Sequence, residues 1–272
     1  MSSAATSLEH CGICSAPLVY EERAQSLTCT VCGVEEMGHV HCPDGHYICE
    51  RCHGANVRGL LLAHIATSRT TSPQALADEL LVQPGLPMLG CEHALIAAGA
   101  LMAALRNRGE HGVTDEHVQE ALLRTERQAI SAYCGLSGVC GVVPALGSCY
   151  SVLVGAQCGK GPETRATMEL VSTLAAATAS EADPGCCKAF VRTGLRVAED
   201  FLAERLGIAV GGDHVSICED AHRHPHGCRG PECTYHPDQP EQTTIAMSAS
   251  PEATGVGAPF KAEAVVEASD CG

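Results

Sequence analysis

The chain has 272 residues, a formal net charge of −15 and 18 cysteines. Its length allows one full domain plus a smaller module. The acidic balance leaves no basic stripe of the kind that nucleic acids and anionic membranes require, so we expect neither as a partner. The first residues have no basic or apolar segment, and the longest apolar stretch, residues 94–105, is too short to cross a bilayer. We therefore expect a cytoplasmic protein without a signal peptide.

The cysteines and the scarcity of aromatic residues limit the fold. In a reducing cytosol, thiols serve mostly as metal ligands or redox groups, because disulfides rarely persist there. The chain has no tryptophan and only three phenylalanines, so its core must be built from closely packed alanine, leucine and valine, which favours helices. We predict a mainly α-helical protein. Its expected parts are a Cys/His-rich, zinc-ribbon-like module (9–54), an all-helical domain (55–210), a Cys/His-rich segment (211–237) and a disordered acidic tail (238–272).

Two C-x-x-C pairs dominate the N-terminal module. Cys11 and Cys14 form the first pair, and Cys29 and Cys32 form the second. Each pair supplies two thiolates from one tight turn, and four thiolates complete the tetrahedral shell of a zinc ion. The spacing predicts that all four cysteines bind one structural zinc; the alternative is a set of free thiols.

Further ligands follow, and they predict a second metal site with three thiolates and one imidazole. Cys42, Cys49 and Cys52 would supply its thiolates. Between the two C-x-x-C pairs we expect a short strand at residues 18–20 that returns at residues 26–28. The candidates for the fourth ligand of the second site are His39, His41, His46 and His53.

The region from residue 55 to residue 207 has helical periodicity and no alternating run long enough for a strand. Ser72 and Thr114 are helix-start signals, and Pro84 and Gly207 are helix-stop signals. We predict six or seven helices in this region. The expected helices span residues 56–68, 72–82, 94–106, 114–131, 144–157, 163–180 and 186–207.

A glycine-rich loop around Cys134 and Cys140 precedes one of these helices. Glycine lets backbone approach a ligand closely, and a helix N-terminus directs its N–H groups at an anion. Cys186 and Cys187 begin the last helix beside Lys188, whose charge would lower the pKa of both thiols. We predict that Cys134, Cys140 and at least one of the paired cysteines form one cofactor site, for a [4Fe-4S] cluster or for reactive thiols. The alternative is that each thiol packs separately into the core.

Three polar residues are catalytic candidates, namely Glu92, His93 and Lys188. A glutamate beside a histidine can act as an acid/base pair. The alternative is that the two residues are only a helix-start charge and a half-buried imidazole.

The segment before the tail is again rich in ligands. Cys218, Cys228 and Cys233 could bind a metal together with a histidine. Their irregular spacing is equally compatible with a coil in which the thiols only pack. Pro, Ser, Thr, Ala and Glu dominate the tail, and this composition predicts disorder.

An ordered series of motifs runs through about residues 9–237. It comprises Cys11-x-x-Cys14, Cys29-x-x-Cys32-Gly33, the run from Cys42 to His53, Glu92-His93-Ala94-Leu95, Cys134-Gly-x-x-Gly-x-Cys140-Gly141, Gly185-Cys186-Cys187-Lys188, Cys228 and Cys233. The series resembles the DUF5714 family, from which the chain departs at Cys91, Pro144-Ala145 and Cys149. The resemblance implies a domain of unknown function that sometimes accompanies radical-SAM or methyltransferase proteins, which are therefore candidate partners.

A second similarity is local. Residues 139–145, Val-Cys-Gly-Val-Val-Pro-Ala, are similar to a segment of the iron–sulfur serine dehydratases. That resemblance implies an open-site [4Fe-4S] cluster and a cysteine at the C-terminal end of the chain, a position that Cys271 would fit.

Three functions are compatible with these patterns. The first is a protein with zinc in its N-terminal module and an iron–sulfur or reactive-thiol site in its helices, handling sulfur or electrons for a partner enzyme. The second is an open-cluster iron–sulfur lyase or sulfur transferase. The third is a non-catalytic adaptor that zinc stabilises.

Overall fold

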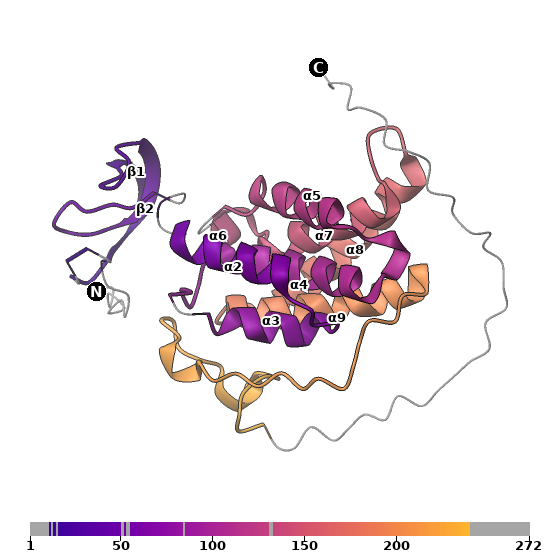
Figure 1. Cartoon of the computed structure of the whole chain (residues 1–272). Helices are drawn as coiled ribbons and strands as arrows, with labels where there is room; N and C mark the ends of the chain where they lie inside the picture. Colours follow the sequence, from indigo (N-terminus) through magenta and orange to yellow (C-terminus); the bar gives the residue numbers. More distant parts are fainter. Residues whose placement is uncertain are drawn as a thin grey trace. The chain divides into compact units, whose positions relative to one another are not determined.

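The computed structural model contains one β-hairpin and a set of helices (Figure 1). His53, Cys271 and the part of the predicted disordered tail from residue 240 on lie outside the residues that it describes. The described residues are 11, 13–14, 16–49, 52, 55–83, 85–130 and 133–239.

The hairpin consists of β1 (Val19–Thr28) and β2 (Glu35–His41), which pair antiparallel with a register shift inside β1. Its turn closes through a hydrogen bond from the Cys29 amide to the Val34 carbonyl at 2.8 Å. Gly33 adopts a φ of 73° in this turn, a conformation that side chains disfavour. The second C-x-x-C pair is therefore the tip of the hairpin.

This hairpin corrects the strand prediction. Residues 26–28, expected as the return strand, continue β1 instead, and the return strand is β2. The prediction placed the turn between the two cysteine pairs, whereas the chain uses the second pair itself as the turn.

The remaining elements are helices, and the mainly α fold is confirmed. All seven expected helices are present, and α6 is an additional short one. The described residues between 55 and 207 contain no strand, and none of the described helices is both long and apolar enough to cross a membrane. The helices are α2 (Ala55–Thr67), α3 (Pro73–Leu81), α4 (Glu92–Arg108), α5 (Asp115–Glu126), α6 (Tyr133–Ser137), α7 (Val142–Val154), α8 (Gly161–Ala179) and α9 (Cys187–Leu206), with single 3-10 turns η1 (Glu110–Gly112), η2 (Ala221–Arg223) and η3 (Gly230–Glu232).

α4 is the central helix of this part (Figure 1). It packs against α2, α3, α5, α7 and α9, and every residue from Glu92 to Leu105 is buried. Alanine and glycine make up much of its surface, so neighbouring backbones can approach closely. At Gly99 an added Cβ would lie 2.3 Å from Cδ1 of the buried Ile65 in α2. Because the core has few large aromatic side chains, the helices pack at short distances from one another.

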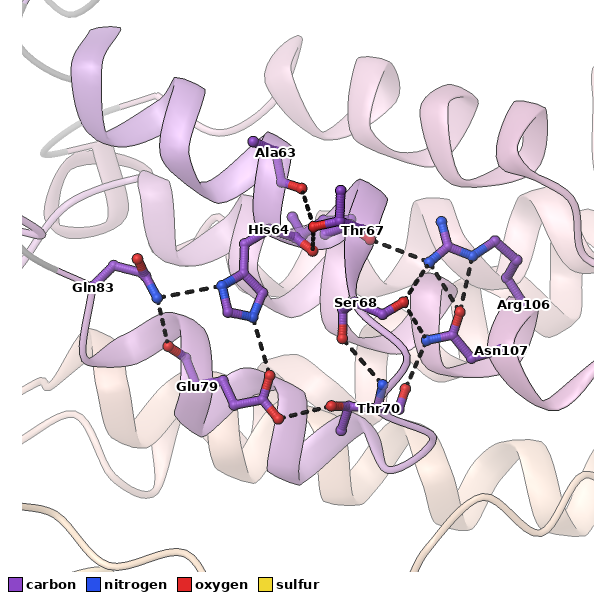
Figure 2. A network of polar contacts seen from close by, with 10 residues as sticks. Ala63, His64, Thr67, Ser68, Thr70, Glu79, Gln83, Arg106 and Asn107 are labelled. Carbon is purple, nitrogen blue, oxygen red and sulfur yellow. Dashed lines mark hydrogen bonds and ion pairs between the residues drawn. The ribbon is translucent and has the colours of Figure 1, made fainter.

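Polar side chains at the end of α4 fix the connection between α2 and α3 (Figure 2). Arg106 Nη2 donates to the carbonyls of Ile65 and Ser68, both at 3.2 Å. Asn107 Nδ2 donates to the carbonyls of Ser68 at 3.0 Å and Thr70 at 2.8 Å. Backbone acceptors in the connection are thereby satisfied, and the connection is tied to the end of α4.

α9 carries a buried carboxyl group. Glu199 is 8% exposed, and its Oε1 has no hydrogen-bond partner among the described residues. Burial raises the pKa of Glu199 to about 7, against the opposing effect of a hydrogen bond from Gln74. The fold therefore favours the protonated form of this carboxyl group.

We expect Gly99→Ala to destabilise the protein by roughly 1–3 kcal/mol, because the new methyl group overlaps Ile65 in a packed interior. Gly59→Ala in α2 is the matched control, since nothing lies within 4 Å of the added Cβ there. That variant should gain up to about 1 kcal/mol from helix propensity. Urea unfolding measures both, and equal effects of the two substitutions would contradict the close-packing account.

We expect Glu199→Gln to stabilise the protein at neutral and alkaline pH. An unfolded glutamate titrates near a pKa of about 4.3, so the raised folded pKa contributes stability that is present below that value and lost as pH rises towards about 7. The gain from the substitution should be on the order of 2 kcal/mol at about pH 8 and small at about pH 4. Urea unfolding of both proteins across this range checks it, and a difference that does not vary with pH would refute it.

Candidate metal centres

Two groups of four ligands meet in the N-terminal part. The first is Cys11, Cys14, Cys42 and His46, and the second is Cys29, Cys32, Cys49 and Cys52. Within each group the ligand atoms all lie within 4.8 Å of one another. Three thiolates with one imidazole, or four thiolates, are typical ligand sets of structural zinc sites. Both groups could hold such an ion.

The hairpin places each group at one of its ends. Cys11 and Cys14 precede β1 and Cys42 follows β2, so antiparallel pairing brings the three together. Cys14 Sγ and Cys42 Sγ are 3.4 Å apart. Gly45, with a φ of 82°, turns the chain so that His46 can complete the group.

The second group forms at the hairpin tip. The chain after His46 returns to the tip, where the Thr30 amide donates to the Tyr47 carbonyl at 2.7 Å. The Cys49 amide then donates to Cys29 Sγ at 3.3 Å. Cys32 Sγ lies 3.6 Å from Cys49 Sγ. Two ligands from the hairpin tip and two from the chain that returns to it thus surround one position.

This arrangement corrects the predicted ligand grouping. We expected Cys11, Cys14, Cys29 and Cys32 to share one zinc, but the hairpin holds the two pairs at opposite ends. The structure assigns Cys42 and His46 to the first pair, and Cys49 and Cys52 to the second. The predicted set of Cys42, Cys49, Cys52 and a histidine is wrong for the same reason. His39 lies outside both groups, with Nδ1 3.0 Å from the Glu21 carbonyl.

Within each group, the pKa is lowered for some thiols and raised for others. Backbone N–H groups of Cys14 and Ile13 lower the pKa of Cys11 to about 6, and the Cys49 amide is the main cause that lowers the pKa of Cys29 to about 6. Hydrogen bonding to neighbouring thiols raises the pKa of Cys52 to about 12. At least one thiol of each group is therefore readily deprotonated, and a bound cation would favour the thiolate form of Cys52 as well.

A third collection of thiols lies where three helices begin. Cys91 is the N-cap residue of α4, Cys140 precedes the N-cap residue of α7, and Cys187 is the first residue of α9. The Gly90 backbone hydrogen-bonds to the Cys187 thiol. An added Cβ on Gly141 would lie 3.5 Å from Ala94 of α4. The positive ends of three helices are thus brought together beside thiols.

The charge of Cys134 affects the pKa values of both Cys140 and Cys187. The pKa of Cys140 is raised to about 11 and that of Cys187 to about 12, mainly by burial and in smaller part by the charge of Cys134. The predicted lowering by Lys188 is wrong. Its ammonium group is buried, donates to the Leu81 carbonyl at 2.8 Å and forms an ion pair with Asp220. Burial outweighs this already paired charge, and the pKa of Cys186 is raised as well.

The remaining candidates are buried. Glu92 is 7% exposed and His93 is 1% exposed, so they do not form an acid/base pair open to solvent. His93 Nδ1 lies 3.0 Å from the Gly90 carbonyl, to which it must donate; its Nε2 has no hydrogen-bond partner among the described residues. Burial lowers the pKa of His93 to about 4, so the ring is neutral at physiological pH. Cys149 is fully buried in α7 and is a core residue.

Cys186 lies apart from its neighbour Cys187. It packs against a small cluster that contains Cys218 and Cys233 of the C-terminal segment. The two adjacent thiols at the start of α9 thus belong to different surroundings. The motif alone could not separate them, because the residues that surround each thiol are distant in the sequence.

The fold and the ligand groups define a mainly helical, cysteine-rich metal-binding protein. The chain belongs to DUF5714, a family of unknown function, whose model matches residues 61–236. This match begins after the two N-terminal ligand groups and includes the thiols of the helices and of the C-terminal segment. No curated protein and no solved structure matches the chain.

Double substitutions distinguish the observed ligand grouping from the predicted one. Cys14→Ser with Cys42→Ser damages one site and should remove about one zinc per chain. Cys14→Ser with Cys32→Ser damages both sites and should remove about two. Metal analysis of the full-length proteins measures the loss. The reverse order of losses would restore the sequence-based grouping and contradict the hairpin arrangement.

Proposed function

We propose that Cys134, Cys140 and Cys187 hold an iron–sulfur cluster at the joined N-termini of α4, α7 and α9, and that the protein handles electrons or sulfur for a partner protein. The two N-terminal groups hold zinc and have a structural role. The observation that carries this proposal is the meeting of soft thiol ligands with three positive helix ends.

The acidities favour a cluster over reactive thiols. With pKa values of about 11 and about 12, Cys140 and Cys187 keep their protons at neutral pH and are poor nucleophiles. A bound metal removes such protons, because the thiolate is the ligand. The buried Nε2 of His93 in α4, which has no hydrogen-bond partner among the described residues, could accept from a donor or bind a cation. When bound, a cluster would supply electron storage or an iron that accepts a sulfur ligand.

The three thiols are not a compact group of the kind found in the N-terminal part. Among the described residues, only the two N-terminal groups have three or more ligand atoms within 4.8 Å of one another. Binding of a cluster would therefore have to draw Cys134, Cys140 and Cys187 together.

Exposed apolar side chains support a protein partner at this site. Ile130, Tyr133, Leu136 and Val139 are 48–59% exposed, and they flank Cys134, which is itself exposed. Grouped apolar side chains at the surface mark contact sites for other proteins. A partner bound over this loop would lie beside the thiols and shield them from water.

We expect Cys140→Ser and Cys187→Ser to lose iron and acid-labile sulfide together in anaerobically purified full-length protein, because each removes one cluster ligand. Cys158→Ser, at an exposed cysteine between α7 and α8, is the matched control and should retain both. Circular dichroism monitors the helices in each protein. Wild-type protein without iron, or variants with unchanged iron, would refute the cluster.

A further inference from the structure

The C-terminal segment, residues 207–239, has little regular structure of its own. Its described part contains only two three-residue 3-10 turns, η2 and η3. The Cys218 amide donates to the Tyr235 carbonyl at 2.7 Å, and the Tyr235 hydroxyl lies 2.9 Å from Thr193 Oγ1 of α9. The order of the segment therefore comes from single turns and from contacts with α9 rather than from a helix or a strand.

A small cavity lies between this segment and the start of α9. Its volume is about 20 Å³, which is enough for one water molecule or one metal ion. A cluster of several irons and sulfides would not fit. Four thiols and two imidazoles are among the groups that line it, namely those of Cys186, Cys218, Cys228, Cys233, His224 and His236.

Three of these thiols are close neighbours. Cys218 and Cys233 are each 8% exposed, and the partly buried Cys186 packs against the small cluster that contains both. Three neighbouring thiols beside one cavity supply the soft donor set that zinc prefers.

His224 supplies the independent sign of a ligand. The residue is 4% exposed, and its Nε2 has no hydrogen-bond partner among the described residues. Its Nδ1 accepts a hydrogen bond from the His226 amide at 3.3 Å, so the proton of the neutral ring lies on the unpartnered Nε2. Coordination of a cation by Nε2 would move this proton to Nδ1 and give the buried nitrogen the partner that it lacks.

We propose that Cys186, Cys218, Cys233 and His224 form a third metal site, which binds a single soft divalent cation, zinc, and fastens the C-terminal segment to α9. The site joins one ligand from the start of α9 to three from the segment, so metal binding closes a loop of the chain. Its ligand atoms are not all within 4.8 Å of one another, unlike those of the two N-terminal groups. Binding therefore draws the loops of the segment inward.

Cys228 and His236 also line the cavity but are weaker candidates for metal ligands. Cys228 is exposed, so its thiolate gains less from a cation than a buried one. His236 Nδ1 accepts a hydrogen bond from the Asp238 amide at 3.2 Å, and neither of its ring nitrogens is among the buried atoms that lack a partner. Neither residue has the orphaned ring atom that distinguishes His224.

The test is the metal content of the full-length protein after gel filtration, with zinc, iron and sulfide measured together. Wild type should hold about three zinc ions per chain, and Cys218→Ser with Cys233→Ser about two. Cys158→Ser should keep all three. Iron and sulfide should be unchanged in the double variant, so loss of this site is distinguishable from failure of the cluster proposal, in which iron would be absent throughout.

The single variant His224→Gln tests the same site if the double variant fails to fold. It should accelerate release of one zinc to a chelator at least several-fold and raise hydrogen exchange in residues 213–236, while the other two ions leave at the wild-type rate. Wild type with only two zinc ions, a double variant that keeps three, or unchanged release from His224→Gln would overturn the third site.

Discussion

The close approach of helices around α4 is the constraint on which the rest of the structure depends. With no tryptophan and few phenylalanines, the interior can exclude water only if alanine- and glycine-rich surfaces come together. Gly99 of α4, Gly147 of α7 and Gly194 of α9 permit that approach, because an added Cβ at each would lie within 3 Å of a side chain of a neighbouring helix. One consequence is geometric: α4, α7 and α9 pack tightly enough that their N-termini lie side by side, and each of these N-termini carries a thiol.

The same residue type has three different environments in this chain. In the N-terminal part, backbone N–H groups lower the pKa of at least one thiol in each ligand group, and the hairpin fixes the ligands at the spacing of a single ion. At the helix ends, burial raises the pKa values of Cys140 and Cys187. In the C-terminal segment, thiols enclose a cavity of single-ion size. Environment, rather than sequence motif, distinguishes these uses of cysteine.

Much of the helical part could be predicted from the sequence, because apolar periodicity and helix-start and helix-stop residues act locally. The expected helix 186–207 is Cys187–Leu206, and the expected helix 94–106 is Glu92–Arg108. The grouping of the N-terminal ligands could not be predicted in this way, since C-x-x-C spacing does not say which pairs meet. That information is in the hairpin, whose length separates Cys14 from Cys29. The split between Cys186 and Cys187 depends on long-range packing and has no local signal.

The central claim is that the joined helix ends hold an iron–sulfur cluster. Electron paramagnetic resonance of the full-length protein, purified anaerobically and measured before and after chemical reduction, tests it most directly. We expect a cluster signal in one of the two states, altered when Cys187 is replaced by alanine and unaltered when Cys158 is. A protein that contains zinc alone, with no paramagnetic signal and no visible absorbance in either state, would contradict the claim.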